Sequence, residues 1–281
     1  MNRIDQVFAQ LRATPRAALM PYLPLGYPTL DDSQQLIRAV ADAGADLIEL
    51  GVPFSDPLAD GPVIQRATNA ALKNGVTLAK CLDMTAAARA DGVTLPLILM
   101  GYYNPILRFG IEALGRAARD AGADGLIVPD LPPEEAGGLN ATCRAYDLDL
   151  IFLAAPTSPP ARLQNIAEAT RGFMYLVSVV GVTGVRQQVA TDLPEFVARV
   201  RALTTKPVCV GFGIANVDSA RRVARIADGV IVGSALVSKI DDATHAVDAA
   251  RDFVGELRLG LEAEARSVVS GSLRQQTLQE R

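Results

Sequence analysis

The strongest chemical signal in the sequence is a group of acidic residues between positions 46 and 61. This stretch reads Asp-Leu-Ile-Glu-Leu-Gly-Val-Pro-Phe-Ser-Asp-Pro-Leu-Ala-Asp-Gly. The apolar residues around Ile48 predict a short buried strand, yet Glu49 lies in their midst. A carboxyl group in a buried strand is out of place for packing alone. In a site shielded from water its pKa would rise towards neutrality, which suits a general acid or base.

Two further carboxylates follow on the next connection, at Asp56 and Asp60. Pro53 and Pro57 restrict its backbone, because the proline ring fixes φ. We expect Glu49 and Asp60 to face one pocket. The residues alone leave another interpretation open, in which Glu49 is satisfied by backbone donors and the aspartates only stabilise their own turns.

Glycine-containing motifs follow two later apolar runs. Gly211-Phe-Gly213 follows residues 208–210, and Gly233-Ser234 follows residues 230–232. Exposed backbone N–H groups and a short helix start in such positions form a phosphate site in parallel barrels. Turn formation is the alternative role for these glycines. The paired motifs favour a ligand that is a phosphate ester.

Eight apolar runs alternate with helix-like segments along the chain. They cover residues 17–23, 47–50, 97–100, 126–128, 150–154, 174–177, 208–210 and 230–232. This alternation predicts an α/β protein with a parallel sheet closed into a (β/α)8 TIM barrel. Ile4, Phe8 and Leu11 fall at helical spacing, which predicts an N-terminal capping helix. In such barrels the active site lies at the C-terminal ends of the strands.

The length of 281 residues fits a single barrel domain, which we place at residues 1–260. The remaining residues, 261–281, are polar with little apolar periodicity. We expect them to form a frayed or disordered C-terminal tail.

Composition argues against several classes of function. The net charge of -4 and the lack of a basic cluster argue against nucleic-acid and anionic-membrane binding. No apolar stretch approaches the ~20 residues that span a bilayer. No apolar run directly follows Arg3, as it would in a signal peptide, so we expect a soluble, unprocessed chain.

The only histidine, His245, lies outside every predicted strand end, which argues against a histidine-liganded metal site and a metal-dependent sugar-phosphate epimerase. Cys81, Cys143 and Cys209 lack CxxC spacing, as in reduced cytoplasmic proteins.

The residue order from position 49 to position 62 carries a family resemblance. Glu-Leu-Gly-Val-Pro-Phe-Ser-Asp-Pro-Leu-Ala-Asp-Gly-Pro resembles the signature of the tryptophan synthase alpha subunit family. Gly-Val-Thr-Gly at 181–184, Gly-Phe-Gly-Ile at 211–214 and Gly-Ser at 233–234 extend the resemblance over roughly residues 15–260. It implies a lyase of tryptophan biosynthesis that cleaves indole-3-glycerol phosphate by a retro-aldol reaction into indole and D-glyceraldehyde 3-phosphate.

The resemblance also implies residue roles. Glu49 protonates indole C3 and helps to take the hydroxyl proton, while Asp60 binds the indole N–H and stabilises the developing positive charge. Residues 181–193 resemble a closing loop, in which Thr183 contacts Asp60. Some members carry an arginine just before Gly-Val-Thr-Gly, where this chain has Val179 and Val180. The implied substrate-binding residues are Tyr22, Ile64, Met100, Tyr102, Tyr175, Thr183, Gly184, Phe212, Gly213, Gly233 and Ser234.

A partner is implied as well. The resemblance predicts a beta subunit that holds pyridoxal phosphate and receives indole in an alpha2beta2 heterotetramer, with no cofactor in this chain. The expected location is the cytoplasm, or the plastid stroma in a photosynthetic host. The predicted interface residues are Pro53, Asp56, Pro57, Asn104 and Pro132.

Three further rival functions share this fold. An Amadori-type isomerase carries an aspartate at the end of the first strand, where this chain has Tyr22. A stand-alone indole-3-glycerol-phosphate lyase stays open, as does a non-catalytic barrel subunit that activates a partner. Retention of both Glu49 and Asp60 speaks against the non-catalytic subunit.

Overall fold

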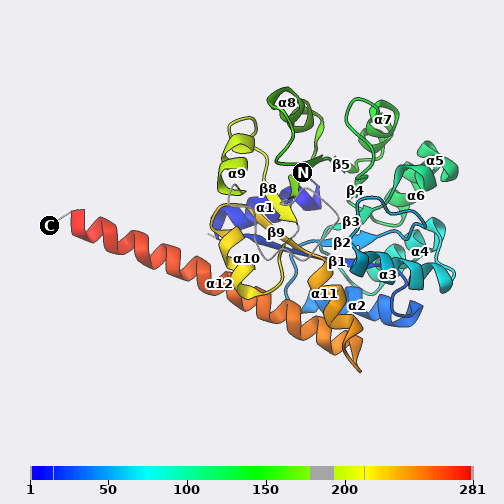
Figure 1. The fold of residues 1–281 in the computed structure, drawn as a ribbon, viewed down its shortest axis with the longest axis horizontal. Coiled ribbons are helices and arrows are strands. Elements are labelled where there is room, and N and C mark those ends of the chain that lie inside the picture. The colour runs from blue at the N-terminus through cyan, green and yellow to red at the C-terminus, as the bar shows by residue number, and fades with distance from the viewer. Residues whose placement is uncertain (1, 15, 178–192, 212, 280–281) are drawn as a thin grey trace.

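A ring of parallel strands enclosed by helices forms the body of the protein (Figure 1). The computed structural model describes residues 2–14, 16–177, 193–211 and 213–279, with side chains as far as residue 265. The strands lie in the order β5-β4-β3-β2-β1-β9-β8-β7-β6. They are β1 (Ala18–Pro24), β2 (Ile48–Gly51), β3 (Leu97–Met100), β4 (Gly125–Ile127), β5 (Asp149–Ile151), β6 (Leu153–Ala154), β7 (Met174–Val177), β8 (Val208–Gly211) and β9 (Gly229–Val232).

The ring closes through a single stretch of chain. The apolar run predicted at residues 150–154 divides into β5 and β6, with Phe152 between them. β5 pairs with β4, while β6 pairs with β7 on the other side. The Phe152 N–H leaves the ladder and donates to the Thr170 hydroxyl at 3.3 Å. The predicted eight-stranded TIM barrel is therefore confirmed, with its fifth strand interrupted.

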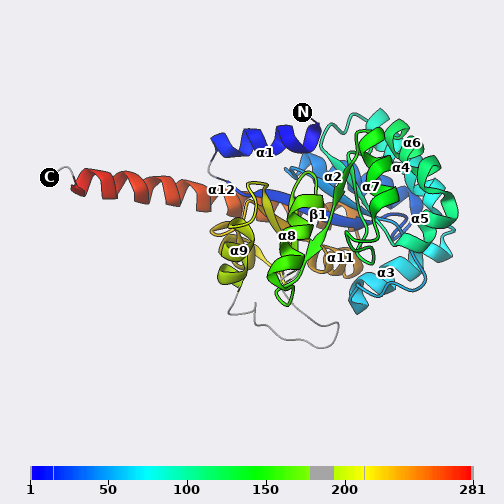
Figure 2. The same ribbon diagram turned by 90° about the horizontal axis from the view of Figure 1, so that it is seen from above.

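Helices cover the outside and one end of the barrel (Figures 1 and 2). They are α1 (Arg3–Ala13), α2 (Leu30–Asp42), α3 (Pro62–Lys73), α4 (Leu78–Ala90), α5 (Tyr103–Phe109), α6 (Ile111–Asp120), α7 (Gly137–Ala145), α8 (Pro160–Ala169), α9 (Leu193–Arg201), α10 (Val217–Ala224), α11 (Ser234–Asp241) and α12 (Ala246–Gln279). Asn2, Thr29, Thr77 and Asn216 cap helices by accepting a backbone N–H, which satisfies donors that a helix start leaves free.

The inside of the barrel has an apolar core of its own. Met20, Ile98 and Ile231 are among the inward-facing residues of the strands, and they form one buried cluster with Ile4 and Phe8 of α1. The rings of Phe8 and Phe173 are 5.9 Å apart. Figure 2 shows α1 lying across one end of the barrel. The predicted N-terminal capping helix is confirmed.

At this capped end, aspartates join neighbouring strands. Asp46, Asp124 and Asp228 each precede a strand and accept a backbone N–H from the start of an adjacent strand. The donors are Leu19 of β1 and Leu97 of β3, and the same arrangement recurs at β8, each at 2.8 Å. The carboxylates thereby replace hydrogen bonds that the ends of a sheet would otherwise lack.

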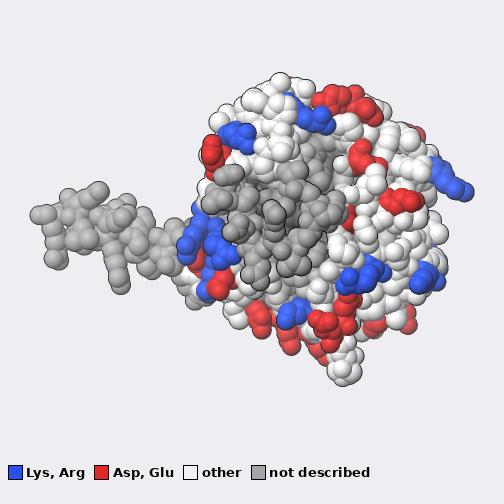
Figure 3. Space-filling view, in the orientation of Figure 1, with Lys and Arg blue, Asp and Glu red and all other residues white. Residues whose placement is uncertain are grey.

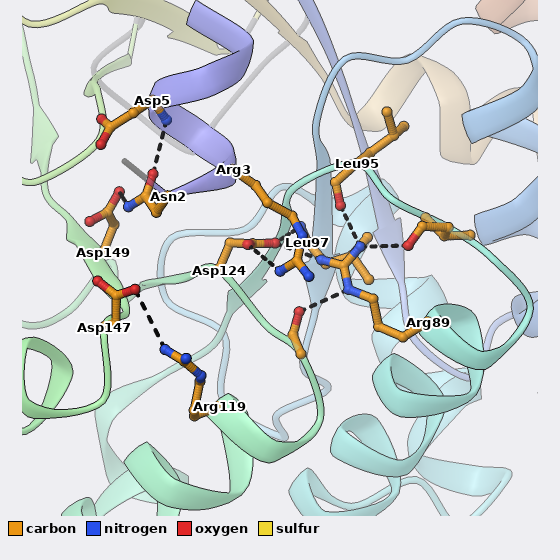
Figure 4. Close-up of polar contacts among 12 residues, drawn as sticks. Asn2, Arg3, Asp5, Arg89, Leu95, Leu97, Arg119, Asp124, Asp147 and Asp149 are labelled. Carbon is orange, nitrogen blue, oxygen red and sulfur yellow. Dashed lines mark hydrogen bonds and ion pairs between the residues drawn. The ribbon is translucent and has the colours of Figure 1, made fainter.

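Arginines neutralise these carboxylates. Asp124 is 4% exposed and lies between Arg89 at 2.6 Å and Arg3 of α1 at 2.9 Å (Figure 4). Asn2, just before α1, makes a second contact with the barrel by donating a hydrogen bond to the Asp149 carboxylate at 2.8 Å (Figure 4). Charge pairing therefore stabilises the N-terminal end of the barrel and holds the capping helix on it.

The C-terminal helix α12 (Ala246–Gln279) packs on α2, α10 and α11 and then extends away from the barrel (Figures 1 and 2). The predicted domain boundary at residue 260 falls within this helix. The division into a barrel and a frayed or disordered tail stays a prediction.

Charged side chains of both signs are distributed around the barrel. Figure 3 shows basic and acidic groups interspersed along the rim of the face that is seen in Figure 1. This mixture accords with the modest net charge of -4. The described residues of this face therefore present no broad basic surface of the kind that binds a polyanion.

Replacing Asp124 with alanine removes the acceptor of the Leu97 N–H and leaves Arg89, 14% exposed, without its carboxylate. We expect Asp124→Ala to lower the free energy of unfolding by about 3–5 kcal/mol, because an unpaired buried charge is costly. Chemical denaturation measures this change. Asp42→Ala is the matched control, because its pair with Arg38 is more than half exposed, and it should cost less than about 1 kcal/mol. Equal effects of the two substitutions would contradict a structural role for the Asp124 cluster.

Candidate active site

A cavity opens at the C-terminal ends of the strands, opposite the capping helix. Strands β1, β2, β3, β7 and β9 contribute to it, together with the starts of α3 and α11. The residues that line it are Tyr22, Glu49, Asp60, Gly61, Ile64, Met100, Tyr175, Gly213, Ile214, Ile231, Gly233 and Ser234.

Glu49 lies within β2, between Tyr22 of β1 and Ile98 of β3 in the parallel register. Its side chain is buried, with the residue 1% exposed, and within the described part of the chain neither carboxyl oxygen accepts a hydrogen bond. Burial, and secondarily the charge of Asp60, raises the pKa of Glu49 to about 8. Glu49 is therefore protonated near neutral pH and has a proton to donate.

Asp60 lies at the end of the loop between β2 and α3. The Tyr102 hydroxyl donates to its carboxylate at 3.0 Å, and the Ala59 N–H donates to the same hydroxyl at 3.0 Å. Burial raises the pKa of Asp60 to about 6, while the Tyr102 hydrogen bond acts in the opposite direction. Near neutral pH Asp60 therefore carries a charge and Glu49 does not, which is how carboxyl pairs divide acid and base roles.

Two tyrosines stand beside Glu49 in the cavity wall. Burial raises the pKa of both Tyr22 and Tyr175, and the charge of Asp60 contributes at each. Each ring lies against a glycine of the adjacent strand. A Cβ at Gly211 would lie 2.5 Å from the Tyr175 hydroxyl oxygen, and one at Gly51 would collide with the Tyr22 hydroxyl. The glycines thus allow both hydroxyls to stay in the wall as protonated donors.

Backbone groups supply the other side of the cavity. Gly213 follows β8, while Gly233 and Ser234 lie where β9 leads into α11. Ser234 is exposed and is the first residue of this helix, whose free N–H groups carry partial positive charge. An anionic group is stabilised at such a helix start. The cavity thus joins a carboxyl pair at one side to an anion-binding backbone at the other.

Most of the residues predicted for the site come together here. Tyr22, Ile64, Met100, Tyr175, Gly213, Gly233 and Ser234 line the cavity with the two carboxyl groups. Tyr102 instead lies behind Asp60, where its ring is 5.3 Å from Phe54. Thr183, Gly184, Phe212, Val179, Val180 and most of the predicted closing loop lie outside the described residues.

Sequence reasoning missed Gly61, Ile214 and Ile231, which also line the cavity. Gly61 and Ile214 directly follow residues that were predicted for the site, and that adjacency was a usable signal. The inward direction of Ile231 depends on the alternation of side chains along β9.

The residues predicted for a partner interface differ in exposure. Asp56 and Asn104 are exposed, while Pro57 and Pro132 are half-buried. Pro53 is buried, so it offers little surface to a partner and acts chiefly through the shape of its loop. Asp56 accepts a hydrogen bond from the Ser55 hydroxyl at 2.5 Å.

A larger and more open groove lies at the capped end of the barrel, beside α1. Three of the arginines that line it form ion pairs, Arg16 with Asp46, Arg201 with Asp228, and Arg225 with Glu264. Paired charges of this kind stabilise the fold and offer little to a substrate. The cavity that holds Glu49 is therefore the better candidate for the active site.

The described residues hold neither a metal-binding group nor a membrane-spanning helix. Among them, no three histidine, cysteine or acidic side chains gather in a group that could hold a metal ion. In the same part of the chain, no helix combines the length and the apolar character needed to cross a bilayer.

Comparison with known proteins gives one consistent kind of relative. The profile of the family described as tryptophan synthase alpha chain matches residues 8–264. The tryptophan synthase alpha chain of Roseiflexus sp. (strain RS-1) is 53% identical over 260 residues, covering 92% of this chain and 100% of that protein. A chain of Mycobacterium tuberculosis tryptophan synthase has 45% identity and a TM-score of 0.86, covering 93% of this chain and 98% of that one. Subunit alpha from Legionella pneumophila str. Paris has 36% identity and a TM-score of 0.87, with 94% and 99% covered.

The carboxyl group of Glu49 makes stability depend on pH. Its pKa of about 8 in the folded chain exceeds the ordinary value of 4.5, so the folded state holds the proton more tightly and loses stability as the pH rises through this interval. A glutamine at this position cannot ionise. We expect Glu49→Gln to be stabilised relative to the wild type by on the order of 3 kcal/mol more at pH 8 than at pH 5.

Denaturation at both pH values measures this difference, with Glu134→Gln as a control at an exposed glutamate. If the stabilities of Glu49→Gln and the wild type change in parallel with pH across this range, the pKa of Glu49 is not raised in the folded chain.

Proposed function

The chain belongs to the tryptophan synthase alpha chain family, and we propose which of its residues carry out the alpha reaction. It is a lyase of tryptophan biosynthesis that cleaves indole-3-glycerol phosphate into indole and D-glyceraldehyde 3-phosphate. The observation that supports the residue assignment is the state of Glu49. Its carboxyl group is buried, lacks a hydrogen-bond partner among the described residues and lies in the same cavity as Asp60.

Glu49 and Asp60 divide the work of the reaction. Glu49, protonated near neutral pH, donates its proton to C3 of the indole ring. The ring nitrogen then carries positive charge, which the ionised Asp60 stabilises by accepting the N–H. The Glu49 carboxylate takes the proton of the side-chain hydroxyl as the bond between C3 and the adjacent carbon breaks. The bonding electrons return to the ring, which yields indole and the aldehyde and restores protonated Glu49.

The remaining cavity residues hold the substrate. Apolar and aromatic walls, which include Ile64 and Met100, suit the indole ring, and the tyrosine hydroxyls suit the glycerol portion. The N–H groups around Gly233 and Ser234 receive the phosphate. Further roles follow from family membership alone, for residues outside the described part of the chain. These are contacts of Thr183, Gly184 and Phe212 with the substrate or with Asp60.

Indole passes to a beta subunit, which is the subunit that uses pyridoxal phosphate in this family. We place the contact on the active-site face, around exposed Asp56 and Asn104 with the half-buried Pro57 and Pro132, and we assign an alpha2beta2 heterotetramer in the cytoplasm. A stand-alone lyase is the second candidate, and a non-catalytic activating subunit is the third. The presence of both carboxyl groups in one cavity favours a catalytic chain.

Glu49→Gln keeps the shape of the side chain and removes the proton donor. We expect kcat for indole release from indole-3-glycerol phosphate to fall by about 10²–10⁴-fold, because general acid and base contributions have this size. Substrate affinity, measured by calorimetry, should stay close to that of the wild type. Near-normal turnover in the variant would remove Glu49 as the acid. Indole release by the wild-type chain with and without a beta subunit separates the three candidate functions.

Asp56→Ala tests the partner contact, since Asp56 is exposed on the loop that ends at Asp60. We expect the beta subunit to activate this variant less than the wild type, while the activity of the isolated chain stays within about twofold. Steady-state assays of both forms measure the ratio. If isolated and partnered activities fall by the same factor, Asp56 shapes the active-site loop and does not contact the partner.

A further inference from the structure

A polar cluster outside the cavity joins three elements that surround it. Asp241, the last residue of α11, accepts a hydrogen bond from the Tyr27 hydroxyl in the loop between β1 and α2. The Arg66 guanidinium group of α3 lies 3.6 Å from the other carboxyl oxygen of Asp241. We call these three residues the Asp241 cluster. A single carboxylate thereby links α3, α11 and the β1–α2 loop.

The two helices that the cluster links both begin at the cavity. α3 starts at Pro62, directly after Asp60 and Gly61, and α11 starts at Ser234, directly after Gly233. Apart from Pro62, these residues line the cavity. The helices lie side by side in both ribbon views (Figures 1 and 2). Their relative position therefore sets the distance between the carboxyl end of the site and its anion-binding end.

A small apolar cluster also joins the two helices. Ile64 and Ala67 of α3 meet Val237 of α11 and Tyr22 of β1 in a small buried cluster. Contacts of this kind depend on buried area and have little directional preference. The hydrogen bond and ion pair of Asp241 are directional, and they act at the far end of α11 from the cavity. They supply the geometric constraint that the small apolar contact lacks.

Tyr27 is itself held in place. The Asn74 side-chain amide, just after the end of α3, donates to the backbone carbonyls of Gly26 at 2.9 Å and Pro28 at 2.8 Å. The Gly26 N–H donates to the Ser33 hydroxyl at 2.8 Å. Both neighbours of Tyr27 are thus fixed, so its hydroxyl presents a defined point of attachment to Asp241.

We propose that Asp241 is a positioning residue, which with Tyr27 and Arg66 aligns the start of α11 with the start of α3 so that phosphate and indole bind at the correct separation. This inference rests on the proposed function. Asp241 does not line the cavity and so acts through the backbone at Gly233 and Ser234. Loss of its contacts should lower the affinity for phosphate while Glu49 and Asp60 stay in place.

The test compares Asp241→Asn and Tyr27→Phe with a matched control, Asp242→Asn. Asp242 is the adjacent residue, and its side chain makes no hydrogen bond or ion pair with the described part of the chain. After burial, its charge is the second factor that raises the pKa of Asp241, so Asp242→Asn leaves the Asp241 carboxylate ionised. We expect Asp241→Asn to raise both KM and the dissociation constant for inorganic phosphate by about fivefold to tenfold, because a neutral amide accepts a weaker hydrogen bond than a carboxylate by about this factor. kcat should stay within about twofold. Tyr27→Phe should act in the same direction, and Asp242→Asn should match the wild type.

Calorimetric titration with inorganic phosphate gives the affinity without turnover, and thermal melting reports the stability of each variant. A double variant should be little worse than the weaker-binding single variant, because Asp241→Asn weakens and Tyr27→Phe removes the same hydrogen bond. A folded Asp241→Asn chain with wild-type phosphate affinity overturns the proposal, as does a lower Tm with KM unchanged. If Asp241→Asn fails to fold, Tyr27→Phe decides by the same criteria. A wild type that binds phosphate but does not cleave indole-3-glycerol phosphate contradicts the proposed function instead.

Discussion

In the mechanism that we propose, the Glu49 carboxyl group must stay shielded from water within a barrel strand. Burial favours its protonated form, and the charge of Asp60 in the same cavity favours it further. A hydrogen-bond donor beside this carboxyl group would stabilise its ionised form, so the fold would be more stable but Glu49 would no longer hold a proton to donate. The chemistry therefore requires a destabilised residue, and the rest of the barrel must offset its cost.

The two ends of the barrel treat acidic residues in opposite ways. At the capped end, Asp46, Asp124 and Asp228 accept backbone N–H groups and pair with arginines, and these contacts stabilise the strand starts. At the open end, Glu49 accepts nothing from the described residues and Asp60 accepts chiefly from a tyrosine. Stability and chemistry are thus separated along the barrel axis, as parallel β/α barrels allow.

The order of amino acids along the chain specifies the architecture and the centre of the site. Apolar runs alternating with helical segments specify a parallel barrel, because each strand is buried on both faces and each helix on one. The acidic motif around Glu49 and Asp60 and the glycines after the last two strands mark its C-terminal face, because strand ends of one direction meet at one end of the ring. These signals lie within short stretches of chain, so periodicity and residue order reveal them.

The pKa values and side-chain contacts of the site residues depend instead on the closed barrel. The pKa of Glu49 depends on which groups surround its oxygens, and the lack of a donor among the described residues follows from closing the ring around it. Tyr102 donates a hydrogen bond to Asp60 and is not among the residues that line the cavity, although its sequence position suited the cavity wall equally well. The contact between Tyr27 and Asp241 joins positions 214 residues apart. No local pattern encodes the contact between Tyr27 and Asp241, because it forms only when β1 and β9 become neighbours as the barrel closes.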